Sequence, residues 1–186
     1  MNSNEINEHI NISKEVLEEK NIVVKNFEEI QSLADLKNKL DDKTLTIEGI
    51  KIDLKTRDAI YKLTKNNDLD TIHFNNCEIN DAFFTLIFWL NVEELSITNC
   101  NLTPYQGKLI IDGLNPYVSI DLDLSNNNLG ENGTEFLEFL GKHVDENIAS
   151  LNLKGNGFKS EDINKFLSTR ISDYDIYFDD IQEIDK

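Results

Sequence analysis

Residues 119–129 read Ser-Ile-Asp-Leu-Asp-Leu-Ser-Asn-Asn-Asn-Leu, and residues 148–158 read Ile-Ala-Ser-Leu-Asn-Leu-Lys-Gly-Asn-Gly-Phe. Apart from Ser119 at the first position, both stretches follow the pattern L-x-x-L-x-L-x-x-N-x-L, in which L stands for an apolar residue. A pattern that recurs at a period of a few tens of residues indicates a repeated unit of structure, because each unit buries its apolar face against its neighbours.

The same pattern extends in both directions along the chain as six aligned copies. Apolar residues recur at positions 4, 6 and 11, and position 9 is a turn residue that faces inward. Position 4 falls on Leu45, Ile72, Leu95, Leu122, Leu151 and Tyr174, so the copies are spaced by 27, 23, 27, 29 and 23 residues. Position 9 falls on Ile50, Cys77, Cys100, Asn127, Asn156 and Asp179.

These copies resemble leucine-rich repeats of the ribonuclease-inhibitor-like kind, and the likeness covers about residues 42–181. The resemblance implies an α/β fold: a leucine-rich repeat solenoid with parallel strands on its concave face and helices on its convex face. The first and last copies are degenerate, because Ile50 and Asp179 stand where Asn or Cys is typical. Terminal repeats of a solenoid are commonly atypical because they cap the stack.

The segments between the copies carry helix signals. Ala82–Leu90 is apolar at the 3.6-residue period of a helix, and Thr103 stands as a candidate N-cap before Pro104. We expect two further helices, one over 133–143 that buries Phe136, Leu137 and Leu140, and one whose first turn is capped by Ser160.

Three regions follow from these signals. We expect a flexible N-terminus over 1–13, a helical N-terminal cap over 14–41, and about six leucine-rich repeats over 42–186. Within the cap, residues 13–20 indicate a short helix, residues 22–24 a candidate initial strand, and residues 26–40 a helix with an apolar stripe.

The composition limits the partners of the chain. It has 35 acidic and 18 basic residues, for a formal net charge of −17. This charge disfavours nucleic acid and anionic membrane, both of which bind Lys and Arg. A protein partner with a basic patch is the natural complement, whereas a purely solubilising charge that keeps the chain monomeric is the alternative.

Residues 1–20 are polar and acidic, which does not fit a secretory signal, and the longest apolar run is too short to span a bilayer. Cys77 and Cys100 occupy position 9 of consecutive copies, where we expect buried, reduced thiols that suit the cytosol. A disulfide between adjacent copies is the alternative. The expected location is the cytoplasm, or the host cell if the chain is secreted.

Asp121-x-Asp123-x-Ser125 is similar to the beginning of an EF-hand calcium loop. Asn126 and Asn132, however, stand where that loop requires Gly and Glu, and both aspartates fall on an expected strand. The sequence therefore predicts no metal site here.

Catalytic patterns are equally weak. Strand alternation directs His73 outward while Cys77 turns inward, so the two cannot form a nucleophile–base pair. The many carboxylates have no evident apolar pocket that would raise a pKa, and no phosphate-binding, zinc-protease or C-x-x-C motif occurs. We therefore expect a non-enzymatic protein without a cofactor.

The expected concave face is formed by positions 3, 5 and 7, which point away from the buried positions 4 and 6. From the third copy onward these positions become acidic, and an aromatic side chain lies beside the acids. The candidate partner-binding residues are Glu94, Asp121, Asp123, Asp173, Asp175, Tyr177, His73 and Lys154. A solvated strand face without a partner is the alternative interpretation.

These observations predict a protein–protein interaction module. Its Asn-, Lys- and Ile-rich composition and acidic tail, with Ile184 third from the end, resemble effectors that intracellular bacterial pathogens deliver through Dot/Icm type IV secretion. This resemblance implies a host protein as partner. An intracellular scaffold or inhibitor that masks a basic protein surface is one alternative, and an enzyme with an unrecognised site on its loops is another.

Overall fold

The computed structural model describes residues 18–36, 40–131, 134–142, 147–170 and 174–179. These residues form nine strands and six helices. In chain order the elements are β1 (Asn21–Val24), α2 (Phe27–Ala34), β2 (Thr44–Glu48), β3 (Lys51–Ile52), α3 (Leu54–Asn66), β4 (Thr71–Asn75), β5 (Glu78–Ile79), α4 (Asp81–Ile87), β6 (Glu94–Thr98), α5 (Pro104–Gly113), β7 (Ile120–Asp123), α6 (Glu135–Leu140), β8 (Ile148–Asn152), α7 (Ser160–Thr169) and β9 (Asp175–Tyr177).

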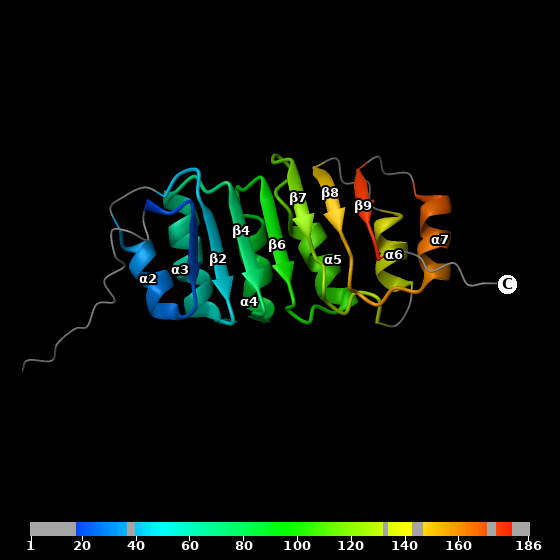
Figure 1. Cartoon of the computed structure of the whole chain (residues 1–186), viewed down its shortest axis with the longest axis horizontal. Helices are drawn as coiled ribbons and strands as arrows, with labels where there is room; N and C mark the ends of the chain where they lie inside the picture. The colour runs from blue at the N-terminus through cyan, green and yellow to red at the C-terminus, as the bar shows by residue number, and fades with distance from the viewer. Residues whose placement is uncertain (1–17, 37–39, 132–133, 143–146, 171–173, 180–186) are drawn as a thin grey trace, which may run out of the picture.

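Seven strands form one parallel sheet in the order β1-β2-β4-β6-β7-β8-β9. Each inner strand of this sheet therefore lies between the sheet strands that precede and follow it along the chain. Figure 1 shows the strands as a row of arrows with the helices behind them, so the helices cover one face of the sheet. We call the other face the open face. The short strands β3 and β5 pair separately. The predicted α/β class with parallel strands is confirmed.

The apolar residues at position 4 of the copies lie opposite one another across the sheet. Leu45 pairs with Ile72, Ile72 with Leu95, Leu95 with Leu122, and Leu122 with Leu151. Residues at position 6 are equally enclosed, because the side chains of Leu124 and Leu153 have no exposed surface. At β7 a register shift brings Ile120, in place of the polar Ser119, opposite Ile148.

The last copy lies two residues later than predicted. Ile176, and not Tyr174, pairs with Leu151, so Asp179 also leaves position 9. A shift of two keeps every side chain on its predicted face, because strand side chains alternate with a period of two. Aromatic packing favours this register: the ring of Phe178 lies edge-on to Phe158 at 5.7 Å and to Phe166 at 6.2 Å, between centroids.

The predicted N-terminal cap contains a strand as well as a helix. Strand β1 pairs with β2 and forms one edge of the sheet, with Ile22 and Val24 in the core. Helix α2 then begins after Asn26, whose side chain accepts a hydrogen bond from the backbone N–H of Glu29. The helix ends at Ala34, earlier than the predicted residue 40. The predicted flexible N-terminus, residues 1–13, lies outside the described residues.

The other helices follow the predicted signals with one exception. Thr103 and Gln106 form a capping box around the Pro104 start of α5, and α6 buries the three predicted side chains Phe136, Leu137 and Leu140. Ser160 is the first residue of α7, whereas the N-cap is Lys159 and makes no side-chain capping hydrogen bond. The N-terminal dipole of α7 is instead complemented by two acids in its first turn.

Buried polar side chains connect the turns that follow the strands. Asn127 accepts hydrogen bonds from the backbone N–H groups of Cys100 (3.0 Å) and Leu102 (3.1 Å), and its amide donates to three carbonyl oxygens. Asn156 repeats the arrangement one copy later by accepting from Leu129 (3.1 Å). Both asparagines thereby satisfy backbone groups that would otherwise be buried without partners.

Candidate functional site

The open face presents one side chain from every second residue of each strand. Because the strands pair in register, these side chains form rows that run across the sheet. The first row is Thr44, Thr71, Glu94, Asp121, Ser150 and Asp175, and the second row is Thr46, His73, Ser96, Asp123, Asn152 and Tyr177. Strands β2 and β4 contribute no acid to these two rows, whose carboxylates lie on β6, β7 and β9. Glu48, further along β2 on the same face, is paired with Lys25 at 2.9 Å.

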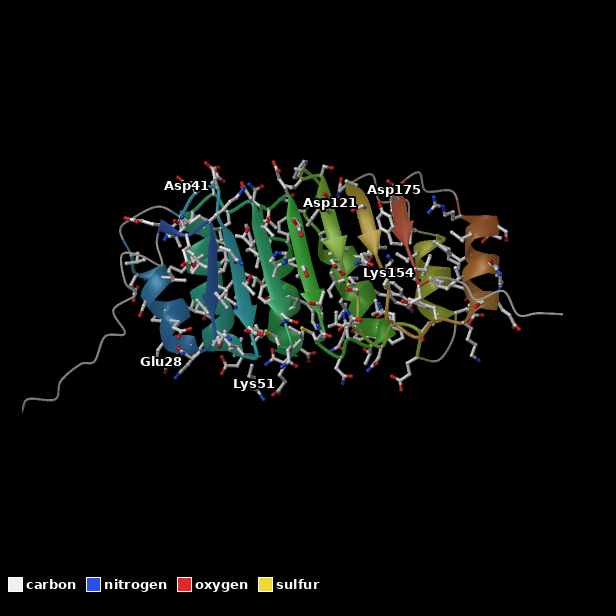
Figure 2. The ribbon with its side chains drawn as sticks, viewed as in Figure 1. Glu28, Asp41, Lys51, Asp121, Lys154 and Asp175 are labelled. Carbon is white, nitrogen blue, oxygen red and sulfur yellow. The ribbon has the colours of Figure 1, made fainter. Side chains whose placement is uncertain are left out.

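Five of the eight predicted residues line a single hollow on this face. The hollow has a volume of about 230 Å³ and is lined by Glu94, Asp121, Leu122, Asp123, Ser150, Asn152, Lys154 and Tyr177. We call it the acidic hollow. Three carboxylates lie in it, and Lys154 is its single cation. Figure 2 shows Asp121 and Lys154 toward opposite ends of neighbouring strands, so the hollow has a negative and a positive end.

Hydrogen bonds from the neighbouring strand hold two of the carboxylates. The Ser150 hydroxyl donates to Asp121 Oδ1 at 2.6 Å, and the Asn152 amide donates to Asp123 Oδ2 at 3.0 Å. The backbone N–H of Ser125 donates to Asp123 Oδ1 at 2.8 Å. Neither aspartate makes an ion pair with any described residue. The two carboxylates are thus oriented by hydrogen bonds but not paired with a cation among the described residues.

The other predicted residues lie around the acidic hollow or outside the described part of the chain. Asp175 is exposed on β9 opposite Ser150, and His73 is half-buried on β4, two strands away from β7. Tyr177 is 47% exposed and lies opposite Asn152. Asp173 is outside the described residues. Sequence reasoning did not select Ser150 and Asn152 as site residues, although their positions 3 and 5 place them in the same rows.

The catalytic alternatives gain no support from the geometry. Cys77 is buried in a turn, where its thiol donates to the Ile47 carbonyl at 3.3 Å, whereas His73 faces the open side of the sheet. No group of three or more His, Cys, Asp or Glu side chains converges as a metal site among the described residues.

Cys77 and Cys100 lie in neighbouring copies of the repeat, and both are free thiols. The backbone N–H of Cys77 donates to Cys100 Sγ at 3.3 Å, and both side chains are buried as predicted. The hydrogen bond between the cysteine side chains and burial both raise the pKa of Cys100 above its ordinary value. Cys100 is therefore protonated at neutral pH, which suits a structural and not a nucleophilic thiol.

No family model, curated protein or solved structure matches this chain. The candidate site therefore rests on its own residues. In the described part of the chain, every helix is too short or too polar to cross a bilayer.

A second cluster was not predicted from the sequence. Arg57 and Tyr61 on α3 meet Thr85 and Trp89 at α4, on the helical side of the molecule. The signals that could have revealed it are the four-residue spacing of Arg57 and Tyr61, which places both on one face of α3, and the basic composition of α3.

Proposed function

We propose that this chain is a leucine-rich repeat solenoid that acts as a non-enzymatic protein-interaction module. Its concave surface would be the open face, and its ligand a basic segment of another protein. The acidic hollow is the observation that carries this proposal. It combines three carboxylates without a described counter-ion and one partly exposed aromatic side chain, Tyr177.

Two structural observations support the solenoid. The strand order is sequential from one edge of the sheet to the other, whereas doubly wound nucleotide-binding sheets reverse their strand order at a switch point. The helices lie behind the sheet in Figure 1, whereas doubly wound sheets carry helices on both faces. Such an arrangement leaves a broad sheet face accessible to a protein partner.

The chemistry of the acidic hollow favours Lys or Arg side chains. A guanidinium group can donate two parallel hydrogen bonds to one carboxylate, which adds geometric specificity to the charge attraction. Tyr177 provides a rigid surface for the aliphatic part of such a side chain, as tyrosines at interfaces often do. Lys154 would pair with an acid on the partner and so set its orientation.

The setting we propose is a bacterial effector that binds a host protein, in the bacterial cytoplasm before delivery and in the host cell afterwards. The acidic tail behind this proposal, residues 180–186, lies outside the described residues. An intracellular inhibitor that masks a basic enzyme surface would use the same face and the same charges. Both versions act as monomers, and neither involves nucleic acid or membrane.

The test is binding kinetics with a partner purified after a pull-down from host-cell lysate. Replacing both aspartates, Asp121→Asn and Asp123→Asn, should slow association and weaken its salt dependence, because charges at an interface mainly steer the encounter. Tyr177→Ala should instead raise the dissociation rate. The matched control is Asp42→Asn with Asp68→Asn, which removes two exposed charges at the turns before β2 and β4.

The control should bind like the wild type. If the variant of Asp121 and Asp123 also binds with unchanged rates and salt dependence, the open face serves solubility alone. The proposal would then be wrong.

A further inference from the structure

Helices α3 and α4 lie side by side, and their outer surfaces enclose a groove of about 270 Å³. It is lined by Arg57, Asp58, Tyr61, Thr85, Leu86 and Trp89, and we call it the α3/α4 groove. Two contacts span it: Arg57 Nη1 donates to Thr85 Oγ1 at 2.8 Å, and the rings of Tyr61 and Trp89 meet edge-on at 6.0 Å. The groove is on the opposite side of the sheet from the acidic hollow.

The groove exposes more aromatic surface than a solvated helix face requires. Trp89 is 58% exposed and the neighbouring Phe88 is 47% exposed, with their rings 5.3 Å apart between centroids. Contiguous exposed apolar side chains with a polar rim are typical of protein-binding sites, and Trp is the residue most enriched at their energetic centres.

One N–H donor of the Arg57 guanidinium group has no hydrogen-bond acceptor among the described residues. Its Nε is buried and has no hydrogen-bond partner among the described residues. Each Nη atom makes one contact: Nη1 donates to Thr85, and Nη2 lies 2.6 Å from a carboxylate oxygen of the exposed Asp58. A guanidinium group has five N–H donors in a planar fork that fits a carboxylate. A buried donor without a partner is uncommon. The Arg57 side chain as a whole is 26% exposed, so an acceptor from outside can meet the guanidinium group on its exposed side.

The charge of α3 agrees with an acidic ligand. The helix has four basic residues, Lys55, Arg57, Lys62 and Lys65, against one acid, Asp58, which leaves a net charge of +3. Every other described helix is neutral or acidic, in a chain whose net charge is −17. Lys65 also lies 5.7 Å from the ring centroid of Tyr61, which keeps a cation at the aromatic edge of the groove.

We propose that the α3/α4 groove docks an acidic peptide segment of a partner protein. One carboxylate of the segment accepts hydrogen bonds from Arg57, and an adjacent apolar side chain packs against the exposed surface of Trp89 and Tyr61. This is a second interaction surface, separate from the acidic hollow and of opposite charge preference. The proposal does not depend on the open face being a binding site.

Trp89 is the single tryptophan of the chain, so its fluorescence reports directly on the groove. The probe is a short synthetic peptide without Trp or Tyr, in which one Leu is flanked by Asp and Glu. Two matched peptides replace the acids with Lys or the Leu with Ser. We expect saturable binding with a blue shift for the first peptide only, and an affinity at least about tenfold higher than that of the Lys peptide.

Arg57→Gln should weaken binding of the acidic peptide about tenfold, because it removes a charge-assisted pair. Thr85→Glu should abolish binding by placing a carboxylate of the chain itself beside the guanidinium, and it tests the proposal even if Arg57→Gln unfolds. Lys159→Gln, an exposed charge change before α7, is the control and should leave the affinity unchanged.

Equal binding of the acidic and Lys peptides, or full affinity in both groove variants, would overturn the proposal. A blue shift that develops with protein concentration alone would also overturn it. In that case the occupant of the groove is a second copy of the chain.

Discussion

At the scale of single residues, the inward turn position accepts Asn and Cys for the same physical reason. Both side chains are short enough to turn back under the strand end, and both can hydrogen-bond backbone groups there. Asn127 makes five such hydrogen bonds, two as acceptor and three as donor. Cys100 does less: its thiol donates to Thr98 O at 3.1 Å and its sulfur accepts from one N–H. At this position, packing therefore accounts for a larger share of the stabilisation by a Cys than by an Asn.

Truncating a core leucine should have a large effect. Leu153 is fully buried at position 6, so Leu153→Ala should lower the free energy of unfolding by about 2–5 kcal/mol. Urea denaturation followed by circular dichroism measures the change. The exposed Lys159→Ala is the control, and it should stay within about 0.5 kcal/mol. A loss of similar size in both variants would contradict the interior position of Leu153.

The raised pKa of Cys100 predicts a pH effect on stability. In the unfolded chain this thiol ionises with a pKa of about 8.5, whereas in the folded chain it stays protonated to higher pH. The contribution to stability is therefore complete below about pH 8.5 and is lost as the pH rises above it. The hydrogen bond to Cys100 lowers the pKa of Cys77, which opposes this decline but is the smaller of the two shifts. Urea denaturation between neutral and alkaline pH should therefore show a net decline, and Cys100→Ala should show a smaller one.

The same burial should make both thiols slow to react with a chromogenic thiol reagent at neutral pH until denaturant is added. Rapid labelling of the native protein would place the cysteines outside the core.

At the scale of secondary-structure elements, the helices differ in how their first turns are completed. Asp53, Asn80 and Thr103 accept backbone hydrogen bonds at the beginning of α3, α4 and α5. Thr134 and Lys159, which precede α6 and α7, make no side-chain capping bond. Close packing between helices constrains the sequence as well. A Cβ atom built on Gly107 of α5 would lie 2.7 Å from side-chain atoms of Leu129 and Phe136, so any larger residue would force these buried side chains to shift.

Disrupting the capping box of α5 should therefore lower the stability of the fold more than replacing a threonine that makes no capping hydrogen bond. Thr103→Ala should destabilise the protein by about 1 kcal/mol, because the backbone N–H of Gln106 loses its side-chain acceptor. Thr134→Ala is the matched control and should cost less, since Thr134 caps no backbone N–H. Denaturant midpoints of the two variants give the comparison, and equal losses would show that the box contributes nothing specific.

At the scale of the whole molecule, charge is distributed unevenly over a strongly acidic chain. The acidic hollow lies on one side of the sheet and the basic helix α3 on the other. The exposed ion pair of Lys51 with Glu78 joins neighbouring copies, as does the pair of Glu135 with the half-buried Lys108, but exposed pairs contribute little to stability. Repulsion among the remaining acids is therefore the dominant long-range electrostatic effect.

Salt should accordingly stabilise the folded chain. Raising sodium chloride from about 20 mM to about 500 mM at neutral pH should raise the thermal midpoint, because the shorter screening length weakens repulsion among the acids. Near the sequence pI of about 4.4 the same change should have a smaller effect, since the net charge is then small. A midpoint that falls with salt at neutral pH would show that the ion pairs outweigh the repulsion.

The sequence alone determined which residues form strands and which side of each strand faces the core. Alternation and the recurring apolar positions are local signals, and they placed Leu122, Leu124, Leu151 and Leu153 inside before any packing was known. They also placed Asp121, Asp123 and Tyr177 together on the other face. Capping residues next to a helix are equally local, which is why Thr103 and Pro104 were predicted correctly.

Tertiary structure decided what depends on contacts between distant segments. The register of β9 follows from Phe178 packing against Phe158 and Phe166, and a two-residue shift leaves the local alternation unchanged. The hydrogen bond from Ser150 to Asp121 joins residues on adjacent strands, and the α3/α4 groove joins residues 28 positions apart, as its Arg57–Thr85 hydrogen bond shows. Local periodicity tells which face a residue occupies, but only the packed chain sets the offset between neighbouring strands and helices.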